Sequence, residues 1–405
     1  MWKRARGHDL TRDYAGSVRI IHVSDCYLPR LGGIEVQVAD LVRMQREAGH
    51  DAEVVTATPG EPLPGVHRIV AKLPFDLPVH PTGTGHLLRL LAARRPDVVH
   101  VHAGAVSPFA WMGVRAAARA GLPVVVTVHS MWDPVTRVLY RALRALTGWQ
   151  GWGLVGTAVS EAAARPIRAV AGPGVPVHVV SNGLDVSAWR PEAPAVRPAD
   201  GGAAAGERDG EGDGGPDARP AAVHVVAVGR LAPRKQPVRL LRLLKEARAQ
   251  VPAAVPLRAT IVGDGPARAQ MERYLRANGM TGWVSLPGRY SRERIREVLA
   301  SADVFVAPAP RESFGLAALE ARAAGVPVVA RAQSGVADFV RPGKEGLLGR
   351  SFDELVASVA RLARDRGLRE SIAAHNRATE PVRCAWPAVL EGFDRCYAEA
   401  RTLKG

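Results

Sequence analysis

Two cations in the second half of the chain have the spacing to hold a phosphate. Arg230 and Lys235 stand five residues apart, with Pro233 in the turn between them. Arginine can bind a phosphate through two parallel hydrogen bonds, and lysine adds a point charge beside it. A single Arg and Lys pair is more often a solvated surface, so this motif alone is a weak indication of an anion site.

A second group combines two carboxylates with the start of an expected helix. Glu312 and Glu320 are about two turns apart, so each can serve a different hydroxyl-rich part of one ligand, such as a ribose and a hexose. Between them, the backbone N–H groups of Phe314, Gly315 and Leu316 lie at the helix N-terminus, where free donors and the helix dipole attract anions. Gly315 has no Cβ that would keep a phosphate away.

A third motif, Gly263-Asp-Gly-Pro266, is a less specific signal, because such segments are usually only strand-to-helix turns. The dinucleotide fingerprint would place a third glycine at position 268, where this chain has Arg268. We expect Asp264 to fix its own turn. The three motifs gain weight from their order, because each follows an expected strand of one domain.

The second half reads as alternating strands and helices, with uninterrupted Val and Ile runs that are typical of parallel strands covered on both faces. The expected strands are 223–228, 259–262, 283–286, 304–307 and 326–330, and the expected helices are 238–248, 267–277, 292–300 and 315–324. In sheets of this kind ligands bind at the carboxyl ends of the strands, which is where the three motifs stand.

The first half repeats this pattern. Expected strands are 18–24, 51–57, 97–102 and 124–129, and a loop containing Gly32 and Gly33 leads from the first of them into a helix. The sequence therefore predicts an α/β fold of two Rossmann-like domains, each a doubly wound parallel sheet.

A change in composition separates the two halves. Residues 191–222 are rich in Pro, Ala, Gly and acidic residues with almost no large apolar side chain, which predicts a flexible linker. We expect a loose leader at 1–17, an N-terminal domain at 18–190 and a C-terminal domain at 223–385.

Composition narrows the classes of function. The 405 residues carry a net charge of +15, which favours acidic partners, but the charge is not clustered in a tail and aromatics are only 5%, so we expect no nucleic-acid partner. Three cysteines without a CxxC spacing fit a reduced, cytoplasmic protein without a zinc site. No apolar run is long enough to span a membrane, and no signal peptide is expected.

Histidines gather near two strand ends of the first half. His129 ends one strand, and its context favours contact with a ligand over a purely structural role. We expect His100 and His102 to alternate across their strand, so that they do not share one site, and to be structural rather than a metal pair.

These motifs together resemble the retaining glycosyltransferases of family 4, which have the GT-B fold with two Rossmann-like domains facing a cleft. The specific part is Arg230 and Lys235 with the Glu312 and Glu320 element, and the resemblance runs from about residue 18 onward. Gly32-Gly33, the segment 97–102, and Asn182-Gly-Leu-Asp185 support it. The helix at about 386–402 resembles the one that packs back on the N-terminal domain, whereas a linker of roughly thirty residues departs from the short hinge usual in the family.

The resemblance implies transfer of a hexose from a nucleotide diphosphate sugar, a UDP- or GDP-sugar, to a hydroxyl-bearing acceptor. Glu320 would hold the ribose, Glu312 the hexose hydroxyls, and His129 would reach the donor sugar near the reacting carbon. The residues expected around the diphosphate and base are Arg230, Lys235, Gly32, Gly33, Gly263, Arg289, Phe314, Gly315, Leu316 and Ser334.

No cofactor or metal is expected. Asp-x-Asp, which holds a metal in the other common glycosyltransferase fold, is absent from the strand ends, so Arg230, Lys235 and the amides of Phe314–Leu316 would stabilise the leaving diphosphate. Two alternatives stay open: a sugar-nucleotide-binding protein without turnover, and a sugar-nucleotide epimerase on the same fold. Donor and acceptor identity are open, and a lipid-linked acceptor is one alternative.

The segment 135–154 has the pattern of a basic amphipathic helix. It places Arg137, Arg141 and Arg144 on one face and Leu139, Leu143 and Leu146 on another, with Trp149 and Trp152 just beyond. One interpretation is docking on an anionic membrane surface, with the tryptophans at headgroup level and the protein peripheral on the inner face of the membrane. The other is a helix packed in the core with a solvated arginine face.

Overall fold

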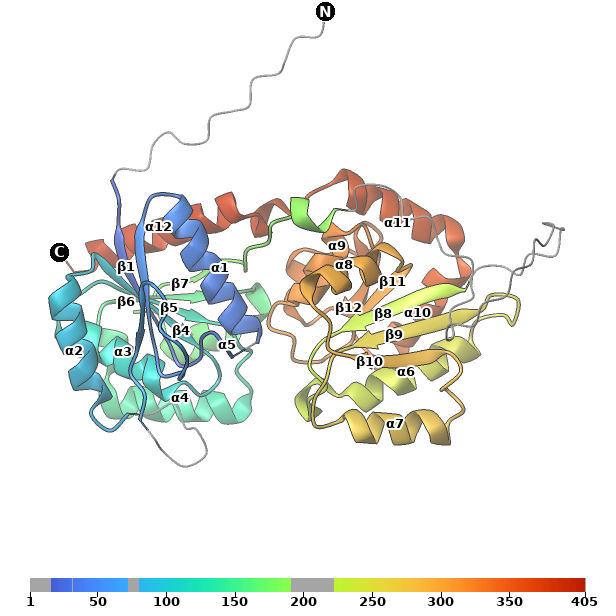
Figure 1. The fold of residues 1–405 in the computed structure, drawn as a ribbon, viewed down its shortest axis with the longest axis horizontal. Coiled ribbons are helices and arrows are strands. Elements are labelled where there is room, and N and C mark those ends of the chain that lie inside the picture. Colours follow the sequence, from blue (N-terminus) through green and yellow to red (C-terminus); the bar gives the residue numbers. More distant parts are fainter. Residues whose placement is uncertain (1–15, 31, 72–79, 191–221, 405) are drawn as a thin grey trace, which may run out of the picture. The chain divides into compact units, whose positions relative to one another are not determined.

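The structure is a computed structural model that describes residues 16–30, 32–71, 80–190 and 222–404. Nearly all of the predicted leader and linker lies outside these residues. The described chain packs as two compact units (Figure 1). The first comprises residues up to Ala158, Ile167–His178 and the chain from Leu390 onward, and the second comprises Val159–Pro166 and Val179–Val389. From Leu390 onward, the predicted C-terminal helix thus belongs to the first unit.

The first unit is built on a seven-stranded sheet in the order β3-β2-β1-β4-β5-β6-β7, and the pairs from β3 to β6 are parallel. The strands are β1 (Arg19–Ser24), β2 (Asp51–Thr56), β3 (Val66–Arg68), β4 (Val98–Ala103), β5 (Val124–Val128), β6 (Leu154–Ala158) and β7 (Val177–Val179). The helices are α1 (Gly33–Glu47), α2 (Gly83–Arg94), α3 (Pro108–Arg119), α4 (Pro134–Thr147), α5 (Glu161–Ala171) and α12 (Trp386–Thr402), of which α5 and α12 give residues to both units.

Alternation along the strands divides the two faces of this sheet. On one face of β1 and β4 the side chains are aliphatic, and α3 packs against them, so closely that a Cβ on Gly113 would lie 2.7 Å from Val23. On the other face stand the buried rings of His22 and His100, which α1 and α12 cover. One half of this core is therefore apolar and the other is polar.

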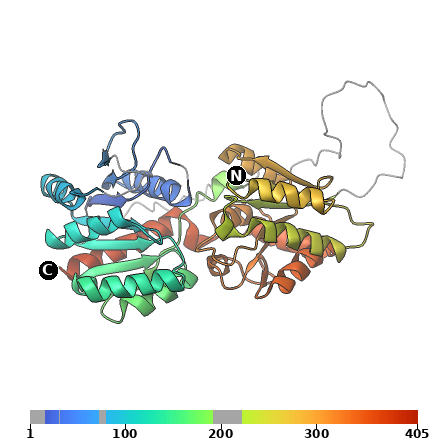
Figure 2. The same ribbon diagram turned by 90° about the horizontal axis from the view of Figure 1, so that it is seen from below.

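The second unit is built on a parallel six-stranded sheet in the order β10-β9-β8-β11-β12-β13. Its strands are β8 (Val223–Val228), β9 (Leu257–Val262), β10 (Val284–Gly288), β11 (Val304–Ala307), β12 (Val328–Arg331) and β13 (Gly346–Gly349). Its helices are α6 (Pro237–Ala249), α7 (Arg268–Ala277), α8 (Arg292–Ala300), α9 (Leu316–Ala323), α10 (Phe352–Arg364) and α11 (Arg366–Ala378). Figure 2 shows helices on both sides of each sheet.

The apolar core of the second unit explains why its strands read as continuous hydrophobic runs. Leu241 and Leu243 of α6, Met271 of α7 and Val359 of α10 are fully or almost fully buried in one cluster with the strand residues. On the other face α9 packs against β11 and β12. β11 and β12, which α10 also contacts, are thus covered on both faces, which is the arrangement that the sequence predicted.

Predicted elements agree with the structure most closely where the pattern is uninterrupted. The strands at 223–228 and 304–307 and the helices at 292–300 and 386–402 have the predicted bounds. The strand predicted at 326–330 instead begins at Val328, because Pro327 has no N–H to give to a ladder.

The amphipathic helix α4 is not the core-packed helix that the second interpretation described. Its buried side is narrow, with Tyr140 against Trp132, so Leu139 and Leu146 remain 49% and 84% exposed. The arginine face is only partly solvated, because Arg141 is exposed whereas Arg144 is partly buried and donates to the carbonyl of Val170. The tryptophan prediction was also wrong for Trp149, which is buried against Trp111. No helix of the described residues is both long and apolar enough to cross a bilayer.

Candidate active site

The polar groups of the second unit meet where the strand order of its sheet reverses. β8 and β11 are neighbours at the centre of the sheet. The chain continues from β8 to β9 on one side and from β11 to β12 on the other, which leaves a crevice at the carboxyl ends of β8 and β11. Lys235 stands in the loop after β8 and Glu312 in the loop after β11. Their Nζ and Oε2 atoms lie 2.5 Å apart, and both side chains are partly buried. Of the predicted residues, this pair is therefore brought into direct contact.

The backbone start of α9 lies immediately after Glu312. Gly315 is its N-terminal flanking residue, with φ of 95°, and no side chain caps the helix. The first amides of α9, beginning with Leu316, are therefore free of a side-chain cap and can bind an anion. The side chain of Phe314 is buried against Phe339, so Phe314 can offer a ligand only its backbone.

The loop after β12 packs directly on this segment. The amide of Gly335 donates to the carbonyl of Glu312 over 2.9 Å, and a Cβ on Gly335 would lie only 2.1 Å from the carbonyl oxygen of Ser313. Ser334 is buried, and its hydroxyl donates to the carbonyl of Arg331. Gly335 thus packs against the loop of Glu312, and Ser334 holds the conformation of its own loop.

The turn after β9 fixes the loop that carries Arg230. Gly263 has φ of +141°, and a Cβ there would lie 1.9 Å from the carbonyl oxygen of Gly229, so only glycine fits. The carbonyl of Asp264 accepts from the amide of Leu231, while its carboxylate accepts from the amide of Gly265. The prediction that Asp264 fixes its own turn is confirmed.

Three more predicted residues differ in their surroundings. Arg230 is exposed and forms no ion pair with any residue that the structure describes, which leaves its guanidinium available for an anion. Glu320 is half-buried on α9, two turns on from Glu312. Arg289 is exposed after the edge strand β10, so the sheet places it two strands away from β8.

The first unit has its own reversal of strand order, between β1 and β4. Gly32 and Gly33 follow β1 at the start of α1, another helix without a side-chain cap, and a Cβ on Gly32 would lie 2.4 Å from the carboxylate of Glu35. His129 follows β5, and its amide donates to the carbonyl of Ala103 over 2.8 Å. These residues therefore line the carboxyl edge of the first sheet.

The expectation that His100 and His102 point to opposite faces was wrong. Residues two apart on a strand share a face. The centres of the two rings lie 4.2 Å apart, and both side chains are fully buried or nearly so. Together with His22 they place ring nitrogens within 4.8 Å of one another, a spacing that a metal ion could use. Every ring nitrogen of the three is already engaged in a hydrogen bond, so binding a metal would require these bonds to break.

Burial keeps this cluster uncharged. Desolvation lowers the pKa of His22 and of His129 to about 4, and it lowers the pKa of His100 and His102 well below the ordinary value. Near neutral pH all four rings are therefore neutral hydrogen-bonding groups.

Asp25 is a buried carboxyl that the motifs did not reveal. It follows β1 directly and accepts a hydrogen bond from the amide of Ala110 at the start of α3. Burial raises the pKa of Asp25 to about 6, because it outweighs the lowering of the pKa by hydrogen bonds to the carboxylate. Its place right after the first strand was the signal available in the sequence, and its contacts indicate a helix-capping role.

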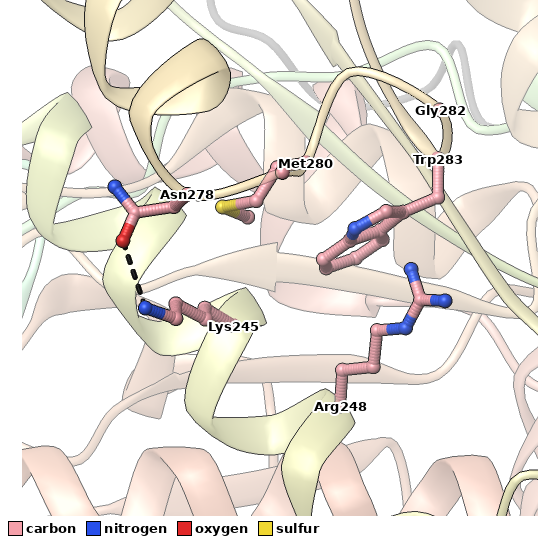
Figure 3. Close-up of a pocket in the computed structure, with 7 residues that line it drawn as sticks. Lys245, Arg248, Asn278, Met280, Gly282 and Trp283 are labelled. Carbon is pink, nitrogen blue, oxygen red and sulfur yellow. Dashed lines mark hydrogen bonds between the residues drawn. The ribbon is translucent and has the colours of Figure 1, made fainter.

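A pocket of about 380 Å³ in the second unit does not coincide with these residues (Figure 3). It is lined by Lys245, Asn278 and Met280 and by Arg248, whose guanidinium lies 4.6 Å from the ring centre of Trp283. Trp283 precedes β10, so the pocket lies at the amino ends of the strands. Ligands of doubly wound sheets bind at the opposite edge, and we therefore place the candidate site at the strand ends of β8 and β11.

Comparison with known proteins agrees with this fold. Residues 220–379 match the family of glycosyl transferases group 1, and residues 31–188 match the model of glycosyltransferase family 4. A GDP-mannose-dependent alpha-mannosyltransferase of Mycobacterium tuberculosis is 29% identical over 403 residues, 95% of this chain and 97% of that protein. A D-inositol 3-phosphate glycosyltransferase of Salinispora arenicola is 28% identical over 95% of this chain and 92% of its own length.

Solved structures give the same architecture. HepE of Anabaena, crystallised with UDP and glucose, superposes with a TM-score of 0.69 at 18% identity and covers 94% of this chain and 99% of its own. The protein is therefore a glycosyltransferase that uses a nucleotide sugar, built on the GT-B fold. It belongs to glycosyltransferase family 4.

The buried histidines predict that acid destabilises the protein. His22, His100, His102, His129 and His224 have lowered pKa values, so below pH 6.5 the unfolded chain binds protons that the folded chain does not. Stability should fall as the pH drops from 6.5 towards 4, by about 1.4 kcal/mol per pH unit for each fully buried histidine. Asp25 has a raised pKa and therefore has the opposite effect on stability between about pH 6 and 4, because in that range the folded chain binds a proton that the unfolded chain does not.

Urea unfolding at pH 7, 6 and 5 measures this dependence. His224→Asn removes one histidine with a lowered pKa and should therefore make the pH dependence of stability shallower. An unfolding midpoint that is equal at pH 7 and pH 5 would contradict neutral, buried histidines.

Proposed function

We propose that the protein is a retaining, metal-independent hexosyltransferase that transfers a sugar from a nucleotide diphosphate sugar to a phosphorylated or lipid-linked acceptor. The observation that carries this proposal is the contact of Lys235 with Glu312 beside the uncapped start of α9. Lys235, Arg230 and the first amides of α9 suit a diphosphate, and the carboxylates of Glu312 and Glu320 suit sugar hydroxyls.

The chemistry needs charge stabilisation at the leaving group. When the bond from the anomeric carbon to the β-phosphate oxygen breaks, negative charge grows on that phosphate. Lys235, the exposed Arg230 and the first amides of α9 are the donors that would meet it, and the amides are fixed in place before the reaction. Glu312, paired with Lys235, would accept from the hexose hydroxyls, and Glu320 from the ribose.

GDP-mannose is the donor to test first. Relatives of this chain include GDP-mannose-dependent mannosyltransferases, one of which acts on a phosphatidylinositol monomannoside. The name of another relative gives D-inositol 3-phosphate, so two of these names carry phosphorylated inositol. The net charge of +15 favours an acceptor of that acidic kind.

The exposed apolar side of α4 supports an acceptor that lies in an anionic membrane. Val135 and Val138 are 77% and 63% exposed, and they continue the exposed Leu139 and Leu146 along one side of the helix. Arg141, also exposed, adds a cation beside them. Apolar side chains of this kind can insert at the level of the lipid headgroups while nearby cations attract anionic lipid.

The leaving-group role of Lys235 is tested by steady-state kinetics. Lys235→Ala should lower kcat by roughly 10²–10³ with little change in KM, because its charge matters most as the phosphate departs. Glu320→Ala should mainly raise KM for the donor, because it loses a ribose-directed carboxylate. Arg234→Ala removes an exposed cation of the same turn and should be close to wild type. Folded Lys235→Ala with wild-type kinetics would refute the model.

Metal independence is tested separately by chelation. EDTA should leave the rate of sugar transfer largely unchanged, because the proposed leaving-group donors are Lys235, Arg230 and backbone amides. The comparison is the same assay with added magnesium. Complete loss of activity that magnesium restores would contradict this part of the proposal.

Membrane docking is tested by co-sedimentation with vesicles of phosphatidylcholine, with and without phosphatidylglycerol. The triple change of Val135, Val138 and Leu146 to Ser should weaken binding to the anionic vesicles roughly tenfold or more, because it removes the apolar contact area. Val382→Ser changes a residue that is 68% exposed in the second unit and is the matched control. If the triple variant and the wild type sediment equally, α4 does not dock on lipid.

A further inference from the structure

A chain of hydrogen bonds, partly buried at His129 and buried beyond it, runs from His129 into the core of the first unit. Nε2 of His129 lies 3.1 Å from Nδ1 of His102, and Nε2 of His102 lies 2.9 Å from Nδ1 of His22. Nε2 of His22 lies 2.7 Å from the amide oxygen of Gln45 on α1. Four side chains from β1, β4, the end of β5 and α1 thus form one continuous path.

A second arm begins at the same glutamine. The amide nitrogen of Gln45 donates to the hydroxyl of Tyr397 on α12, and that hydroxyl lies 2.8 Å from Nδ1 of His100. Nε2 of His100 contacts the hydroxyl of Thr127, which in turn contacts Thr157. Gln45 therefore joins the two arms. Its amide oxygen contacts His22 and its amide nitrogen donates to Tyr397.

Proton positions along such a path are not independent. Each neutral imidazole has one N–H and one acceptor nitrogen, and desolvation keeps all four histidines neutral. A ring that donates through Nε2 must accept through Nδ1, so the orientation of one group dictates the tautomer of the next. The path from Gln45 to His129 therefore has only two complete arrangements of protons, whereas the hydroxyls of the second arm can rotate to donate or accept.

The orientation of the Gln45 amide selects one of them. Its oxygen faces His22, so Nε2 of His22 carries the proton and Nδ1 accepts from Nε2–H of His102. By the same rule His102 accepts from Nε2–H of His129. His22, His102 and His129 then hold the Nε2–H tautomer, which is intrinsically the more stable form of neutral histidine, whereas the reversed arrangement would need the less stable tautomer in each of these three rings.

We propose that Gln45, acting through His22 and His102, is a positioning residue that holds His129 as the Nε2–H tautomer and presents its Nδ1 as a hydrogen-bond acceptor. Nδ1 of His129 has no hydrogen-bond partner among the residues that the structure describes. This inference rests on the proposed function and on the contact of His129 with the donor sugar that the family resemblance implies, where an acceptor nitrogen would take the hydroxyl proton of the sugar in a hydrogen bond.

Gln45→Met breaks the path at its origin. Methionine has a similar length and suits a helix, but it offers Nε2–H of His22 no acceptor. A buried donor without a partner is costly, so the path should reverse and leave the proton of His129 on Nδ1. Thr157→Val is the matched control, because Thr157 is equally buried and makes a similar hydrogen bond, but it ends the other arm.

The tautomers are read by NMR of the full-length, ligand-free protein labelled with ¹³C and ¹⁵N in histidine. His129 should be the Nε2–H form in the wild type and in Thr157→Val, and it should shift towards Nδ1–H in Gln45→Met. The donor assay should show a roughly tenfold fall in kcat/KM for Gln45→Met, the value of one lost hydrogen bond, and no change for Thr157→Val.

Three results would overturn the inference: an Nδ1–H form of His129 in the wild type, a tautomer that Gln45→Met leaves unchanged, or a stoichiometric metal ion in the purified protein that binds His22, His100 and His102. A tautomer that shifts while kcat/KM stays constant would uphold the path and instead contradict the proposed contact of His129 with the sugar.

Discussion

Lys235 and Glu312 are 77 residues apart in the chain, and they meet because β8 and β11 are neighbours at the centre of the second sheet. The order of strands reverses between these two, so the loops that follow them leave in different directions and their first residues remain together. The free start of α9 lies at the same edge. Every group proposed to hold the diphosphate in this unit depends on that one adjacency.

Glycines let neighbouring loops approach closely enough to keep these groups in place. Gly263 rests on the carbonyl of Gly229, and Gly335 rests on that of Ser313, at distances where no Cβ fits. The loops of Arg230 and Glu312 are therefore each supported from behind by backbone rather than by side chains. Such contacts have few degrees of freedom, which suits donors that must be fixed before charge develops.

The first unit uses a different means of fixing its candidate residue. The core beneath His129 contains His22, His100 and His102 where aliphatic side chains would be usual, and each ring has its hydrogen bonds completed by another buried group. A polar network of this kind is costly unless it is fully satisfied, and full satisfaction leaves it few arrangements. The position of the proton on His129 thus depends on Gln45 of α1, which is distant from His129 in the sequence.

The sequence by itself determined the alternation of strands and helices, the two Rossmann-like halves, and the short motifs at the strand ends. These follow from local patterns: uninterrupted runs of Val and Ile, and residue types that suit phosphate and hydroxyl groups. It predicted the bounds of β8 and β11, and hence that the loops with Lys235 and Glu312 share one edge.

Only the tertiary structure decided which of these residues touch. It paired Lys235 with Glu312, left the apolar side of α4 exposed, and joined Gln45 and Tyr397 to the histidines. The physical reason is that helix and strand periodicity tell which residues share a face, but not which face meets the core or what covers it. Gln45 and Tyr397 are 352 residues apart, and no local pattern connects them.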